Sequence, residues 1–132
     1  RRGELIRLNW HDVDFINRVA VLKETKADKP RTIALSPRVI ELLKALPRTV
    51  DGTFFPIKSI SAFEKSFSNA VKRANIDDFH MHDLRHCGAQ HLIEDENWNT
   101  IELMQQGGWT SSGMAKRYAN INPKYLAKKL LK

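Results

Sequence analysis

The sequence predicts a mostly helical α+β fold with a small three-stranded antiparallel sheet near the N-terminus. Apolar and β-branched residues cluster in three short segments, at about 13–15, 19–21 and 33–35, and turn-forming residues separate them. Beyond residue 36, apolar residues recur at helical spacing almost to the end of the chain. A chain of 132 residues is long enough for one domain with its own core.

Local signals place the helices. An apolar helical face runs through residue 9, before the three strands. Ser36 and Pro37 are typical of an N-cap and first helical position, and this helix should end before Pro47. The next helix should begin near Ser59 or Ser61. Further helices are expected at about 82–95, 98–107, 111–120 and 123–131, with Gly107-Gly108 as a stop and Asn122-Pro123 as a start.

Charge indicates a polyanionic partner. Lys and Arg number 22 against 15 Asp and Glu, giving a net charge of +7, which favours nucleic acid ahead of an anionic membrane. No apolar run is long enough to cross a bilayer. The single cysteine, Cys87, cannot form an internal disulfide, which suggests a reducing compartment. Residues 1–6 have the pattern of a helix without a preceding cap, so we expect the chain to be a fragment that starts upstream.

The candidate chemistry centres on His82 and Arg85. Three residues apart on a helix, they share one face and pair a proton-transfer group with a permanent cation suited to phosphate. Trp109 follows Gly107-Gly108, and Tyr118 comes nine residues later. Each alone has an ordinary interpretation: Trp109 is typical of a core aromatic, and the helix residues could form an ion-pair network with Asp83 and Glu94.

A zinc site is the competing interpretation. His82 and His86 have the spacing of a metalloprotease helix, and His80, Cys87 and His91 add possible ligands. Against zinc, Asp83 stands where that motif needs a longer Glu, and Arg85 would place a cation beside the metal. We therefore expect no metal.

Taken together, the motifs resemble the catalytic domain of tyrosine recombinases of the phage integrase family, over nearly the whole chain. The family's opening motif matches Arg1-Arg2-Gly3-Glu4-Leu5, its hairpin lysine falls on Lys26, and its His-x-x-Arg box falls on His82 and Arg85. Its Leu-Gly-His box becomes Gly107-Gly108-Trp109, and its nucleophile box matches Arg117-Tyr118-Ala119. Most members carry His where this chain has Trp109. An indole N–H can donate a hydrogen bond there but cannot accept a proton.

The resemblance implies roles. Arg1 and Arg85 would bind the phosphate with help from Trp109, Tyr118 would be the nucleophile, and His82 and Lys26 would transfer protons. His86 would orient its neighbours, and no cofactor is implied. Further basic residues are candidates for DNA-backbone contacts: Arg31, Lys65, Lys72, Arg73, Lys116 and Arg117.

The resemblance also implies a domain organisation, a function and a partner. Residues 1–132 would form a C-terminal catalytic domain, without its first helix and the separate N-terminal DNA-binding domain. The expected function is site-specific DNA recombination through a 3′-phosphotyrosine intermediate. The expected partner is double-stranded DNA at attachment sites, bound by a homotetramer that exchanges C-terminal tails in the bacterial cytoplasm, with no membrane. The alternative is a DNA-binding module of the same fold that does no chemistry.

Overall fold

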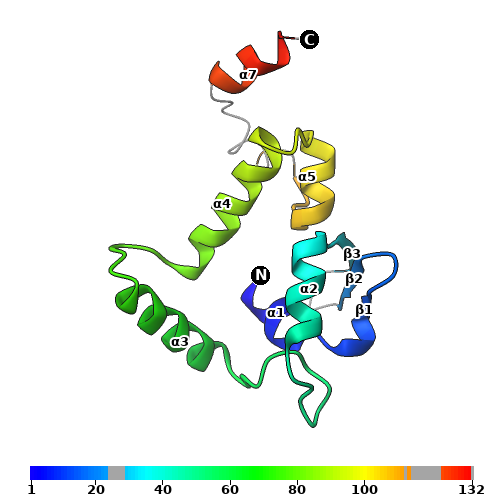
Figure 1. The fold of residues 1–132 in the computed structure, drawn as a ribbon, viewed down its shortest axis with the longest axis vertical. Coiled ribbons are helices and arrows are strands. Elements are labelled where there is room, and N and C mark those ends of the chain that lie inside the picture. Colours follow the sequence, from blue (N-terminus) through cyan, green and yellow to red (C-terminus); the bar gives the residue numbers. More distant parts are fainter. Residues whose placement is uncertain (24–28, 112, 114–122, 132) are drawn as a thin grey trace. The chain divides into compact units, whose positions relative to one another are not determined.

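The computed structural model describes residues 1–23, 29–111, 113 and 123–131 (Figure 1). The chain divides into two compact units, Arg1–Met81 and His82–Lys132, and each is described by itself.

The first unit contains the predicted three-stranded sheet. Strands β1 (Val13–Asp14), β2 (Val19–Leu22) and β3 (Arg31–Ala34) are antiparallel in the order β1-β2-β3. In the register, Ala20 of β2 lies opposite Val13 on one side and Ile33 on the other. The Asp14 carboxylate accepts backbone N–H bonds from residues 16 and 17, which closes the turn between β1 and β2. The α+β fold class is confirmed.

In the described part of the first unit, three helices and a 3-10 turn accompany the sheet. Helix α1 (Arg2–Arg7) ends two residues before the predicted boundary, because the chain turns extended there and Asn9 caps a 3-10 turn, η1 (Trp10–Asp12). Helix α2 (Pro37–Ala45) has the predicted Ser36 cap. Helix α3 (Ile60–Arg73) begins after Ser59, whose Oγ accepts the N–H of residue 62 at 3.1 Å.

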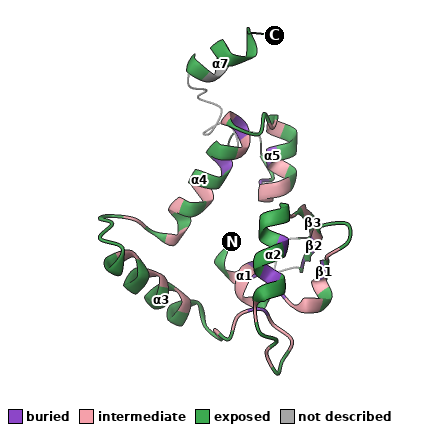
Figure 2. Ribbon diagram, in the orientation of Figure 1, coloured by how far each residue is buried: buried purple, intermediate pink, exposed green. Residues whose placement is uncertain are grey.

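The first unit's core lies between the sheet and α2 (Figure 2). Ala20 and Phe54 are almost completely buried, at 0% and 1% exposure. Trp10 and Phe15 pack on Phe54 with ring centroids 4.4 Å and 6.5 Å away, respectively. This aromatic cluster fixes the segment between α1 and the sheet.

The second unit contains α4 (Met81–Glu94), α5 (Thr100–Gly107) and α7 (Pro123–Lys129). Helices α4 and α5 share a small core of Ala89, Ile93, Leu103 and Trp109. Most of the helix predicted at 111–120 lies outside the described residues. Within the described part of the chain, no helix has the length and apolar character needed to span a membrane.

Candidate active site

Three predicted site residues share one face of α4. The rings of His82 and His86 meet edge to face, with centroids 4.8 Å apart, and Arg85 lies between them in sequence. Partial burial, followed by the nearby charges of His86 and Arg85, lowers the pKa of His82 below its ordinary value of 6.5. At neutral pH the His82 imidazole is therefore mostly uncharged and able to accept a proton.

Arg85 is held by the end of α5. Its Nη2 donates a hydrogen bond to the Gly107 carbonyl, and its guanidinium carbon lies 4.3 Å from the centroid of the Trp109 ring. Trp109 is only 8% exposed, so the cation rests on a buried aromatic face. This combination restricts the orientation of the guanidinium, which is what binding a phosphate in a fixed geometry requires.

The turn after α5 brings Trp109 back against the helix. Gly108 adopts the left-handed conformation, with φ 69° and ψ 31°. The N–H groups of Gly108 and Trp109 both donate to the Met104 carbonyl, at 2.8 Å and 3.1 Å. The predicted Gly107-Gly108 stop is thus also the element that places the indole.

Arg1 belongs to the other unit, where it is the N-cap residue of α1. Glu4, in the first turn of that helix, is a buried charged residue, with its side chain 6% exposed. Arg31 of β3 donates to both Glu4 carboxylate oxygens, one of the two bonds measuring 3.0 Å. This bidentate ion pair joins the helix that carries Arg1 to the strand that follows the Lys26 segment.

The pKa of Glu4 reflects this environment. Burial acts to raise it, but the hydrogen bonds and charge of Arg31, together with the terminal amino group, outweigh burial and lower the pKa below 4.5. Arg31 itself is 15% exposed, and its Nε is buried without a hydrogen-bond partner. A DNA-backbone contact by Arg31 would have to compete with Glu4, so the pairing favours a role inside the unit.

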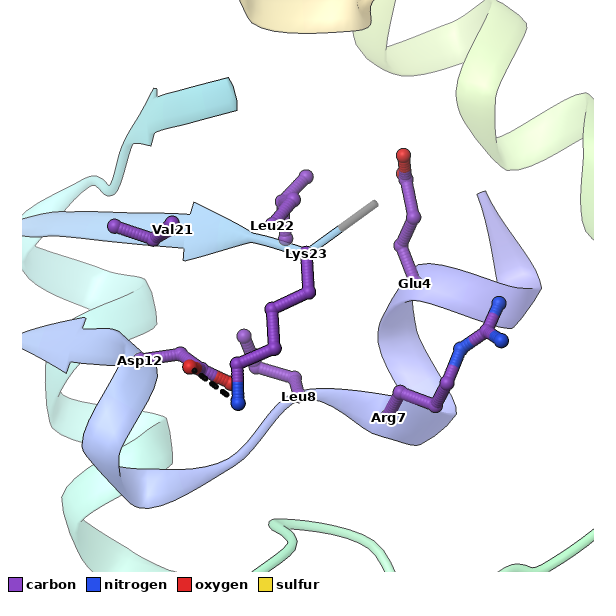
Figure 3. A pocket seen from close by; sticks show the side chains of 7 residues that line it. All are labelled: Glu4, Arg7, Leu8, Asp12, Val21, Leu22 and Lys23. Atoms are coloured by element: carbon purple, nitrogen blue, oxygen red, sulfur yellow. Dashed lines mark ion pairs between the residues drawn. The ribbon is translucent and has the colours of Figure 1, made fainter. Parts of the chain in front are cut away.

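A cavity of about 210 Å³ lies beside Glu4 (Figure 3). Figure 3 shows the Lys23 side chain reaching back to Asp12, with Nζ 3.1 Å from the carboxylate. The Asp12 side chain is 8% exposed, and the ion pair ties the end of β2 to η1. The full lining comprises Glu4, Arg7, Leu8, Asp12, Val21, Leu22 and Lys23.

The remaining predicted residues divide into two groups. Lys65, Lys72 and Arg73 are exposed on α3, with Lys65 and Lys72 on the side opposite Phe63 and Phe67. Four others lie outside the described residues: Lys26, Lys116, Arg117 and Tyr118. In sum, the second unit brings together His82, Arg85, His86 and Trp109, whereas Arg1 lies in the first unit.

Two contributions were not predicted. Glu4 appears in the sequence only as the acidic residue of the opening motif, and Gly107 only as a helix stop. An acidic residue on the apolar side of a short helix, with an Arg in a following strand, is the signal that could have indicated the Glu4 pair. For the zinc interpretation, we find no three His, Cys, Asp or Glu side chains gathered into a metal site among the residues described.

Comparison with known proteins finds a matching family and related recombinases. The sequence model of the Phage integrase family matches residues 1–124. The "Shufflon-specific DNA recombinase" of Escherichia coli is 34% identical over 130 residues, covering 98% of this chain and 34% of that protein. The chain thus spans about a third of that relative's length.

Solved structures share the fold. The catalytic domain of bacteriophage HP1 integrase superposes with a TM-score of 0.71 and 28% identity, covering 97% of this chain and 71% of that one. The crystal structure of XerA recombinase gives a TM-score of 0.82 at 22% identity, over 98% of this chain and 51% of that one. The second likeness concerns the fold alone.

Proposed function

Because the chain belongs to the phage integrase family, we propose that it is the catalytic domain of a site-specific DNA recombinase. It would cut and rejoin DNA strands through a covalent 3′-phosphotyrosine intermediate. The observation that carries the proposal is the family match over residues 1–124, which contains all the motifs in order from Arg1 to Tyr118. A separate DNA-binding domain would lie elsewhere in the complete gene product, which would act in the bacterial cytoplasm.

The arginines would bind the phosphate. The transition state of phosphoryl transfer spreads negative charge over the non-bridging oxygens, and guanidinium groups can bind that charge in a bidentate geometry. Arg1 and Arg85 would take this role, and the Trp109 N–H would donate one further hydrogen bond. The stacking of Arg85 on Trp109 and its bond to the Gly107 carbonyl support a fixed guanidinium. The two cations would supply positive charge without a metal.

Tyr118 would be the nucleophile. Its oxygen would attack phosphorus and form the phosphotyrosine bond, while the bond from phosphorus to the 5′-oxygen breaks. The tyrosine proton would pass to the neutral imidazole of His82, and Lys26 would give a proton to the departing 5′-oxygen. The lowered pKa of His82 supports the first transfer. His86, in contact with the His82 ring, would orient it.

Basic residues outside the site would hold the DNA backbone. The exposed side chains of Lys65, Lys72 and Arg73 on α3 stand outside the core and are suited to phosphate contacts, and Lys116 and Arg117 would add to them. The net charge of +7 supports double-stranded DNA as the partner.

Assembly would involve the C-terminal tail. Helix α7 and the residues after it expose Leu126, Leu130 and Leu131, at 47%, 85% and 86%. These leucines would dock on a neighbouring protomer and link active sites within a homotetramer on DNA.

A covalent-trapping experiment tests the function. The complete gene product is incubated, without metal, with a DNA substrate carrying its attachment site and a nick that prevents rejoining. A protein–DNA adduct that Tyr118→Phe abolishes is the expected result. An adduct that survives this substitution, or activity that a chelator removes, would overturn the proposal. DNA binding with no adduct would instead indicate a binding module without chemistry.

A further inference from the structure

The packing of Trp109 on α5 requires a residue without a side chain at position 107. A Cβ built on Gly107 would lie 2.7 Å from the Cη2 atom of the Trp109 ring and even closer to Cζ3 and Cε3. Gly107 does not have a positive φ, unlike its neighbour Gly108. The requirement at Gly107 is therefore space for the indole, not an unusual backbone.

Gly107 also contacts the proposed phosphate-binding group directly. Its carbonyl accepts the hydrogen bond from Arg85 Nη2, and the ring that occupies its missing side-chain volume supports the same guanidinium at 4.3 Å. One residue thus provides the hydrogen-bond acceptor and makes room for the aromatic surface. A side chain at position 107 would displace the ring, and the guanidinium would lose the surface on which it rests.

We propose that Gly107 is a positioning residue that sets the orientation of Arg85, and that it is matched to the indole at position 109. The inference deepens the proposed function and rests on it where cleavage is concerned. Its structural part, the dependence of Arg85 on Gly107 and Trp109 together, stands on the contacts within the second unit.

The chain offers a matched control for Gly107→Ala. Gly88 lies inside α4, and a Cβ built on it meets nothing within 4 Å. Gly88→Ala makes the same chemical change in the same unit without touching Arg85 or Trp109, and alanine in an open helical position is expected to be neutral or mildly stabilising.

The first measurement follows Arg85 itself by NMR. In the unmodified chain, the indole ring current should shift the Arg85 side-chain N–H resonances away from those of the other arginines. Gly107→Ala should move these resonances toward ordinary values, as Trp109→Ala does, whereas Gly88→Ala should leave them in place. Unchanged Arg85 resonances in Gly107→Ala would overturn the proposal, whether or not the protein cleaves DNA.

The second measurement is a double-mutant cycle on covalent-adduct formation, using Gly107→Ala, Trp109→His and the combination. Gly107→Ala should slow single-turnover cleavage by at least tenfold while DNA affinity stays within about twofold. Because imidazole is smaller than indole, Gly107→Ala should cost much less when His replaces Trp109. Equal costs in both backgrounds would contradict the match between the two positions. If the unmodified protein forms no adduct, the proposed function fails and the NMR result alone decides the positioning role.

Discussion

Replacing Glu4 should destabilise the first unit, because its ion pair with Arg31 is largely buried. Its carboxylate and the Arg31 guanidinium are 6% and 15% exposed, so Glu4→Gln leaves a largely buried cation without its counter-charge. We expect a decrease on the order of 3 kcal/mol in the free energy of unfolding at neutral pH, measured by urea denaturation of the chain. Glu64→Gln is the control, because its pair with Arg2 is half exposed and should contribute less than about 1 kcal/mol.

The same pair predicts a pH dependence. The pKa of Glu4 is lower in the folded chain than its ordinary value of 4.5, so the folded state binds the proton less tightly than the unfolded state. The stabilisation is complete above about pH 4.5 and declines as the pH falls through the folded value. The difference between the unmodified chain and Glu4→Gln should therefore shrink in acid. A difference that stays constant from pH 7 to pH 3 would contradict this assignment.

A further prediction concerns the pKa of His82. An NMR titration of its ring protons should give a pKa below 6.5, and His86→Asn should raise that value because it removes a neighbouring charge. His91→Asn is the control, since His91 lies farther along α4 and pairs with Asp95 at 2.6 Å. If the proposed proton transfer is correct, the acid limb of cleavage should follow the His82 titration. A His82 pKa at or above 6.5 would contradict the lowered value.

Some features of these residues could be predicted from the sequence, and others could not. The spacing of His82 and Arg85 could be read from helical periodicity, because neighbours on one helix face are fixed by local geometry. The contacts of Arg85 with Gly107 and Trp109 depend on how α5 ends and turns back, and no periodic pattern encodes that. Likewise, Arg31 was predicted as a DNA contact from its charge alone, since its partner Glu4 lies in a different element.

Among the elements, helix α3 carries exposed basic residues whose proposed role in DNA binding can be tested separately. Lys65 and Lys72 lie two turns apart on one exposed face, away from Phe63 and Phe67. If both bind phosphates, replacing them with Gln should weaken DNA binding at low salt. The slope of log affinity against log salt should fall by about 0.9 for each phosphate that is no longer neutralised.

Lys58→Gln is the matched control for α3, because Lys58 forms an ion pair with Asp51 in the preceding loop. It removes one positive charge from the same unit but should leave the salt slope nearly unchanged. The measurement is DNA binding by fluorescence anisotropy across a salt series. If the salt slope does not change when Lys65 and Lys72 are replaced, α3 is not part of the proposed interface.

The elements themselves were largely predictable because their ends are marked by local chemistry. Ser36 and Ser59 cap α2 and α3 as expected, through side-chain oxygens that accept N–H groups of the first turn. The end of α1 was missed because Asn9 starts a new 3-10 turn, which interrupts an apolar pattern that continues through it. Competition between a cap and a hydrophobic pattern cannot be resolved from the pattern alone.

For the whole molecule, deletion of the C-terminal tail should weaken assembly on DNA but not folding. Leu130 and Leu131 are exposed and absent from both described cores, so removing residues 123–132 should change the free energy of unfolding by less than about 1 kcal/mol. In the complete gene product, the same deletion should leave binding of a single DNA site intact but weaken the higher-order complex, because the exposed leucines would no longer reach a neighbouring protomer.

Native gel electrophoresis and analytical ultracentrifugation on DNA carrying paired sites measure this difference. Replacing Leu130 and Leu131 with Ser, which keeps the tail's length and charge, should reproduce the deletion. Unchanged assembly in both variants would place the protomer contacts elsewhere in the protein.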